Sequence, residues 1–220
     1  VMVGTEGERA IDTRKLRADT GFVAYDQGYG NTASCESAIT FLDGDAGVLR
    51  HRGYPIEQLA AHSDFVETAY LIIYGELPTP TQRKDFGLLI RINAAIETQM
   101  QKIFEGFPKD APPMAMLSSI VGSLAAHYPQ LATNNFEADL KNFDLAAAIA
   151  ISKIRTFVAM IYRYQRGLPY IFPKQELPFC DNFLHMMFEG TGNTAAQDPA
   201  IANAKSRNLL HCAVSMLFLQ

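Results

Sequence analysis

The sequence lacks the short motifs that mark many nucleotide-binding and hydrolytic enzymes. It contains no G-x-G-x-x-G, no P-loop, no H-E-x-x-H and no G-x-S-x-G. The glycine loops that hold phosphates, the paired histidines that bind zinc and the serine turn of hydrolases are therefore missing. The histidines are scattered singly, so the sequence predicts no metal site. They are His51, His62, His127, His185 and His211.

Cysteine and positive charge are also scarce. Cys35, Cys180 and Cys212 form no C-x-x-C pair, which is typical of reduced intracellular thiols. The net charge is −4 without a long basic run, which argues against a nucleic-acid partner. The first residues carry charges and no apolar core of a signal peptide, and no uninterrupted apolar run approaches the roughly twenty residues of a membrane span. We expect a cytoplasmic protein with no membrane partner.

What the sequence does contain is the pattern of a folded, mainly helical protein. Of its 220 residues 48% are hydrophobic, and its mean hydropathy is −0.01. Near the start, two β-prone runs at 38–42 and 48–49 flank the turn residues 43–47, which predicts a small β-hairpin. Pro55 is then expected to begin a helix, since its fixed φ suits a first helical position.

Further helices follow from caps, breakers and helical spacing. Ser63 precedes an apolar helical pattern that Gly75 is expected to end. Thr79 and Pro80 predict the cap and first residue of one long helix that runs to Gly106. Other helices are predicted over 112–128, 139–167 and 182–190, and from Asp198.

The helix predicted over 112–128 is apolar or small on every side. Its only polar or minimal positions are Ser118, Ser119, Gly122 and Ser123. A helix that is apolar all round is buried all round, so we expect a second subunit to cover it together with the parent core. A central core helix of a monomer is the alternative. The cations near the end of the 139–167 helix are expected to complement its C-terminal partial charge.

Two candidate sites have both structural and functional interpretations. The cluster Arg50, His51 and Arg52 could bind an anionic substrate, but a charged strand end beside a turn is favoured. His185 lies between apolar neighbours, so a hydrogen-bonded core or interface residue is expected. The residues alone thus predict a helical scaffold without an assembled active site.

Five ordered blocks nevertheless resemble the N-terminal half of citrate synthase, especially the longer bacterial type. The blocks are FLDGDAGVLRHRGYPIEQLA, FVETAYLIIYGELPT, PPMAMLSSIVGSLAAHY, SKIRTFVAMIYRYQRGLPY and NFLHMMF. The resemblance implies a multi-helical large domain with a small N-terminal β-hairpin region. It also implies a homodimer or higher homo-oligomer through helices 112–128 and 139–166. Residues 1–54 would form the hairpin segment and 55–204 the helical part of the large domain, with a divergent tail at 205–220.

The same resemblance implies a reaction. The family condenses acetyl-CoA with oxaloacetate and hydrolyses the thioester to citrate and CoA, using an aspartate and two histidines for proton transfer and no metal or redox cofactor. The family's catalytic motifs have no match here, so we expect the catalytic residues beyond Gln220 and interpret the chain as an N-terminal fragment. His211, in Leu210-His211, matches a position that helps to bind oxaloacetate.

Three functions therefore remain open. The first is a citrate synthase-type acyltransferase of the tricarboxylic acid cycle, inactive as the 220-residue chain alone. The second is a non-enzymatic helical remnant or interaction protein, and the third is a fragment of a 2-methylcitrate synthase.

Overall fold

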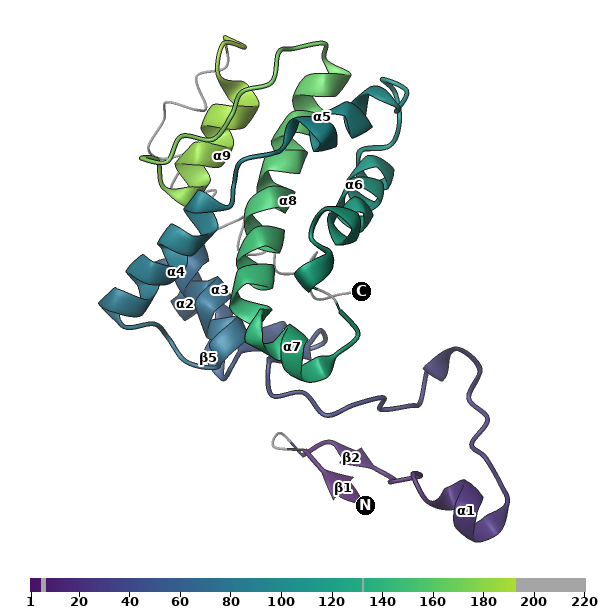
Figure 1. Ribbon diagram of the computed structural model, residues 1–220. Coiled ribbons are helices and arrows are strands. Elements are labelled where there is room, and N and C mark those ends of the chain that lie inside the picture. The colour runs from purple at the N-terminus through teal and green to yellow at the C-terminus, as the bar shows by residue number, and fades with distance from the viewer. Residues whose placement is uncertain (5–6, 132, 193–220) are drawn as a thin grey trace.

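The computed structural model describes residues 1–4, 7–131 and 133–192. The first 39 residues form an arm with paired strands β1 (Met2–Val3) and β2 (Arg9–Ala10), helix α1 (Leu16–Thr20) and the 3-10 turn η1 (Gln27–Tyr29). No described residue of the arm is buried. Figure 1 shows the arm extending away from the helices. The hydrophobic core is therefore built from the rest of the chain.

The predicted β-hairpin is confirmed. Strands β3 (Thr40–Asp43) and β4 (Val48–His51) pair antiparallel, with Asp43 opposite Val48. The Asp43 carboxylate accepts the backbone N–H groups of the two turn residues that follow Gly44, at 3.1 and 2.9 Å. A third strand, β5 (Tyr54–Pro55), pairs with β4. Pro55 therefore has extended backbone before helix α2 (Ile56–His62) and is not its first helical residue.

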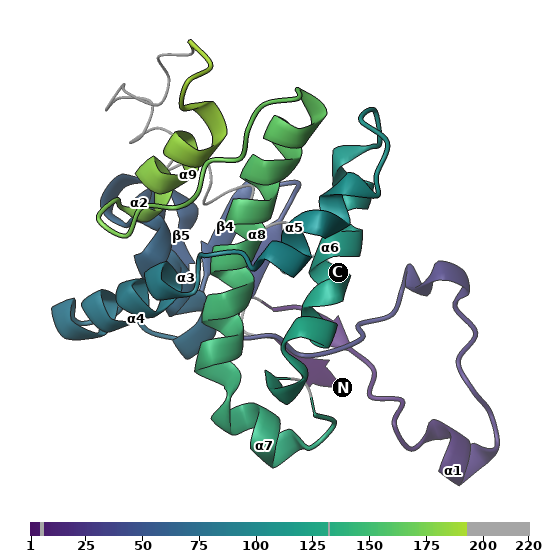
Figure 2. The same cartoon turned by 45° about the horizontal axis from the view of Figure 1, so that its top comes forward.

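The remaining described elements are helices that surround one long central helix (Figures 1 and 2). They are α3 (Phe65–Tyr74), α4 (Pro80–Ile92), α5 (Thr98–Glu105), α6 (Pro113–His127), η2 (Pro129–Leu131), α7 (Phe136–Lys141), α8 (Phe143–Gln165) and α9 (Phe179–Phe188). The mainly helical fold with a small strand region is thereby confirmed. The helix expected from Asp198 lies outside the described residues.

Caps define α3 and α4. Asp64, rather than Ser63, caps α3, and it forms a reciprocal capping box with Glu67. Gly75 ends α3 in the left-handed conformation, as predicted. Thr79 caps α4 with Pro80 at its first position, also as predicted. The negative charge of the Asp64 carboxylate at the N-cap is also stabilised by the positive end of the helix dipole.

The single long helix expected from Thr79 to Gly106 is wrong, because the chain breaks between α4 and α5. In the break, the Thr156 hydroxyl of α8 donates to the carbonyl of Ala94 at 3.0 Å. The Lys153 ammonium, also on α8, donates to the carbonyl of Ala95 at 2.5 Å. These two carbonyls are satisfied by another helix instead of by helical amides four residues on, so the break is stabilised by tertiary contacts.

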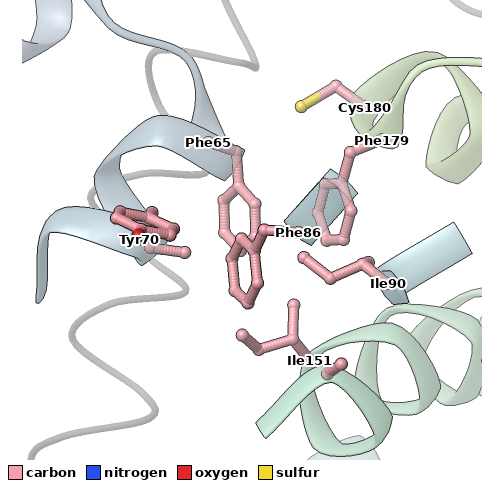
Figure 3. Close-up of a cluster of buried hydrophobic side chains, with 9 residues drawn as sticks. Phe65, Tyr70, Phe86, Ile90, Ile151, Phe179 and Cys180 are labelled. Atoms are coloured by element: carbon pink, nitrogen blue, oxygen red, sulfur yellow. The ribbon is translucent and has the colours of Figure 1, made fainter. Parts of the chain in front are cut away.

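Two hydrophobic clusters lie on different sides of α8. The first joins α3, α4, α8 and α9, and Figure 3 shows its aromatic rings converging with Ile151. Within it, the rings of Phe65 and Phe179 stack with centroids 4.1 Å apart. The second cluster joins α5, α6 and α8 around Phe104 and Phe157. Helix α8 belongs to both, so it is the centre of the fold.

Helix α8 is also apolar and long enough to cross a membrane by length and composition, the one such helix among the described residues. However, 61% of its most apolar stretch is buried against other parts of the chain. That burial is what a central core helix shows.

The predicted helix over 139–167 is divided, because Asn142 separates α7 from α8.

Helix α6 is covered on one side only. Met116 and Ile120 are fully buried, but Met114, Ser118 and Gly122 are exposed. The single chain therefore does not bury this helix on every side. The parent core covers one face and leaves a face of small and apolar side chains open.

Candidate functional site

The candidate substrate-binding residue lies where the structure gives no geometry. His211 falls outside the described residues, as does the divergent tail 205–220. Within the described ranges, no group of three or more His, Cys, Asp and Glu side chains could hold a metal ion. The buried Lys, Arg and His side chains among the described residues lie on the hairpin, on α8 and on α9.

The Arg50, His51 and Arg52 cluster does not form one anion-binding surface. Arg52 donates from Nε and Nη2 to the carbonyl of Ile72 in the last turn of α3, at 3.2 and 2.8 Å. The buried His51 ring lies 3.1 Å from the Thr40 hydroxyl across the hairpin. The structural interpretation is thus confirmed for both residues, because they tie the hairpin to itself and to α3.

Arg163 lies in the last turn of α8, as predicted, and also serves a second helix. Its Nη1 donates to the carbonyls of Met187 and Glu189, at 3.2 and 3.0 Å, and its Nε donates to the carbonyl of Pro169. The first two carbonyls lie at the C-terminus of α9, where helical amides can no longer reach them. The cation therefore stabilises the end of α9 in addition to complementing the C-terminal partial charge of its own helix.

Arg155 makes a second link to α9. Its Nη1 donates to the carbonyl of Phe179 at 3.0 Å, and its guanidinium lies 4.3 Å from the centre of the Phe179 ring. Both arginines thus contact residues 24 positions further along, Phe179 and Met187. The constant offset means that α8 and α9 run parallel and in register, as Figure 1 shows.

A third buried cation, Lys153, joins α8 to α5 and α6. Besides Ala95, its ammonium contacts the Glu97 carboxylate at 3.3 Å, and the Tyr128 hydroxyl donates to the same carboxylate. Burial lowers the pKa of Lys153, and the attraction of Glu97 opposes that change. Burial works to raise the pKa of Glu97, but hydrogen bonds from Tyr128 and Lys153 outweigh it and lower the pKa. Burial and Glu97 together raise the pKa of Tyr128.

His185 occupies the apolar helix as expected. It lies on α9, is almost fully buried, and its Nδ1 is 3.4 Å from the Glu189 carboxylate one turn on. The ring thus has a polar partner inside a packed helix pair. Taken together, these charged side chains bind helices and loops to one another, and none of these contacts pairs an acid with a base around a substrate-sized space.

Sequence reasoning missed the roles of the α8 cations, although a signal for them exists. Polar residues recur inside an otherwise apolar helix, and they lie on faces that neighbouring segments cover. They are Ser152, Lys153, Arg155, Thr156 and Arg163, all buried. A buried polar residue must find a partner, so each of these positions predicts a carbonyl or carboxylate opposite it.

The family model described as "Citrate synthase, C-terminal domain" matches residues 28–213, which is most of the chain. The chain belongs to the citrate synthase family. The resemblance to citrate synthase that the sequence predicts is thus confirmed at the level of the family. The matched range includes the hairpin, all the helices from α2 to α9, and the buried α8 cations.

Solved citrate synthases share the fold. The enzyme from Pyrobaculum aerophilum superposes with a TM-score of 0.72 at 26% identity, over 92% of this chain and 51% of its own length. That from Thermotoga maritima MSB8 gives 0.67 at 27% identity, over 85% and 46%. The citrate synthase of Thermoplasma acidophilum, in a ternary complex with carboxymethyl coenzyme A and oxaloacetate, gives 0.73 at 21% identity, over 85% and 47%.

The coverage shows how much of a citrate synthase this chain represents. It spans about half the length of each of these three structures while most of its own length is matched. The described helices therefore share the fold of about half of a citrate synthase chain.

Proposed function

We propose that this chain provides the scaffold portion of an acyltransferase that condenses acetyl-CoA with oxaloacetate to give citrate and CoA. The observation that carries the proposal is the family match over residues 28–213. The bound carboxymethyl coenzyme A and oxaloacetate of the Thermoplasma acidophilum structure support the choice of substrates.

The described charged groups support a scaffold role rather than proton transfer. Arg52, Arg155 and Arg163 donate to backbone carbonyls of helix termini. Lys153 and Glu97 neutralise each other between helices. A general acid or base must reach a substrate proton, and these groups are already engaged within the protein. We therefore propose that the proton-transfer groups come from outside the described residues, and that the 220-residue chain alone does not turn over.

The test is to incubate the purified 220-residue chain with acetyl-CoA and oxaloacetate and to quantify citrate by mass spectrometry. Direct detection of citrate is preferable to a thiol reagent, because the exposed Cys35 would react with such a reagent. We expect no citrate above a blank without protein. Citrate formation would contradict the scaffold role, and 2-methylcitrate formed from propionyl-CoA in a parallel reaction would favour the methylcitrate alternative.

We also propose a homodimer through the two helical regions 112–128 and 139–166. The open face of α6 supports it, and the start of the second region adds exposed apolar side chains, among them Leu140, Phe143 and Leu145. Exposed apolar surface is a feature of protein–protein interfaces. Sedimentation of Ala125→Glu, an exposed position on α6, tests it, with the exposed Ala61→Glu on α2 as the matched control. We expect only the α6 variant to dissociate.

A further inference from the structure

The N-terminal arm carries aromatic side chains that its own chain does not cover. Within residues 20–35, Phe22, Tyr25 and Tyr29 are 74%, 89% and 76% exposed. The elements that precede this stretch are a pair of two-residue strands and a five-residue helix, which are too short to be stable alone in water. Burial of the exposed rings against another surface would stabilise the arm.

The loop at 26–32 is shaped to present two of these rings. The Asp26 carboxylate accepts the Asn31 amide at 2.8 Å and the Thr32 hydroxyl at 2.5 Å, which closes the loop around Tyr29. These hydrogen bonds lower the pKa of Asp26. Tyr29 has a φ of 58°, in the left-handed region that bulky residues rarely adopt. The loop thus holds Tyr25 and Tyr29 outward, and tyrosine is a frequent anchor of protein–protein interfaces.

The open face of α6 is short of large side chains for an interface. Stable protein–protein interfaces bury roughly 1,200–2,000 Å² in total. Helix α6 has 15 residues, so it is about 22 Å long. Many of its exposed side chains are small, among them Ser118, Gly122 and Ala125. A homodimer through α6 therefore needs further surface from each chain.

The arm lies on the side of the molecule where it can add that surface. In Figures 1 and 2 the arm extends on the side of α8 where α6 lies, away from α4 and α9. A second copy seated on α6 would thus lie on the side to which the arm extends. Charge does not oppose the contact, because α6 contains no Asp, Glu, Lys or Arg and residues 20–35 contain Asp26 as their one charged side chain.

We propose that the arm docks on a second copy of this chain, with Tyr25 and Tyr29 as its anchors. In a symmetric dimer each copy gives its arm and receives the arm of the other, so the contact forms twice. This inference rests on the proposed homodimer and names the segment that completes its interface. The arm is then ordered by the partner and not by the core of its own chain.

Sedimentation of the 220-residue chain tests the anchors. Tyr25→Ser combined with Tyr29→Ser should raise the dimer dissociation constant by about tenfold, because rings that anchor an interface lose their contacts. Phe172→Ser, at an aromatic position that is 50% exposed and lies outside the arm and α6, is the matched control. It should change the constant by less than about twofold. Because all three positions are exposed, the helical core should fold in each variant. An unchanged constant in the double variant contradicts the proposal.

Photo-crosslinking shows which copy the arm contacts. The photoreactive residue benzoylphenylalanine replaces Tyr25, and equal amounts of unlabelled and nitrogen-15-labelled chains are mixed, allowed to exchange subunits and irradiated. The linked peptides are identified by mass spectrometry. We expect the arm to be joined across the two isotope labels as often as within one label. Links confined to a single label would mean that the arm folds on its own chain, and they would overturn the proposal.

The homodimer itself is tested separately from the arm. If the parent chain dimerises and Ala125→Glu dissociates it, but the Tyr25 and Tyr29 double variant sediments like the parent, the α6 interface stands and the arm proposal is wrong. If the parent chain is monomeric throughout the concentration series, the homodimer is wrong and the arm proposal fails with it.

Discussion

Helices α6 and α8 are both strongly apolar, but the single chain buries them to different extents. Helix α8 buries twelve residues between two hydrophobic clusters, and its cations find carbonyl partners on other elements. Helix α6 buries two residues and leaves a face of small and apolar side chains open. Apolar sequence therefore predicts that a helix face will be covered somewhere, but not whether its own chain covers it.

The largest expected effect comes from truncating a buried side chain of α8. Phe157 on α8 is fully buried in the cluster that α6 also joins. Phe157→Ala should lower the free energy of unfolding by about 3–5 kcal/mol, because the cavity cannot close completely. Urea denaturation measures it. Met114→Ala on the open face of α6 is the control, with an expected change within about 0.5 kcal/mol. Equal losses would mean that the two faces are buried alike.

The next effect concerns the polar links that α8 makes and α6 lacks. Arg163→Met should cost about 1–3 kcal/mol, since it leaves the carbonyls of Pro169, Met187 and Glu189 without their donor. Arg166→Met, at an exposed position near the end of α8, is the control and should change stability by less than about 0.5 kcal/mol. Hydrogen exchange should show faster opening of α9 in the first variant alone. Unchanged exchange in α9 would contradict the capping role.

A smaller effect, of opposite sign, tests the open face of α6. Gly122 lies within the helix, and a Cβ added there meets nothing within 4 Å. Gly122→Ala should therefore stabilise the single chain by about 0.5–1 kcal/mol through helix propensity. Gly87→Ala on α4, where the Cβ would make ordinary contact with Val66, should give a similar gain. If α6 packs closely against a second copy, only Gly122→Ala should weaken self-association in sedimentation. Unchanged association would favour another interface.

The smallest effect concerns the hydrophobic contact between α6 and α8. Burial raises the pKa of Tyr170 to about 12, and its ring packs with the cluster shared by α6 and α8. Because the folded value lies above the unfolded value of about 10, the stability linked to the neutral phenol is present below pH 10 and is lost as the pH rises toward 12. Tyr170→Phe should reduce this alkaline loss, to which Tyr128 also contributes. Tyr25→Phe, on the exposed arm, should leave it unchanged.

Much of the fold could be predicted because local chemistry decides it. The hairpin follows from Asp43 and its turn, and α4 follows from Thr79 and Pro80. These elements are stabilised mainly by groups within a few residues of one another. The sequence pattern alone therefore contains the information that places them.

The break after α4 could not be predicted in the same way. It depends on Lys153 and Thr156, which contact the break across 58 and 62 residues of sequence. The capping of α9 by Arg163 is likewise a tertiary contact. Of the candidate site, the structural role of Arg52 was predicted, the place of Arg155 was not, and His211 stays a prediction.

The shared offset of Arg155 and Arg163 fixes which residues of α8 and α9 face each other, and two points of the segment that connects them, Pro169 and Lys174, are also hydrogen-bonded to these helices. Related chains could therefore vary the length of the connection between Pro169 and Lys174 and keep the same helix pairing. One residue inserted inside either helix would turn everything beyond it by about 100°. One guanidinium would then keep its carbonyl while the other pointed away, so natural variation in length should be confined to the connection.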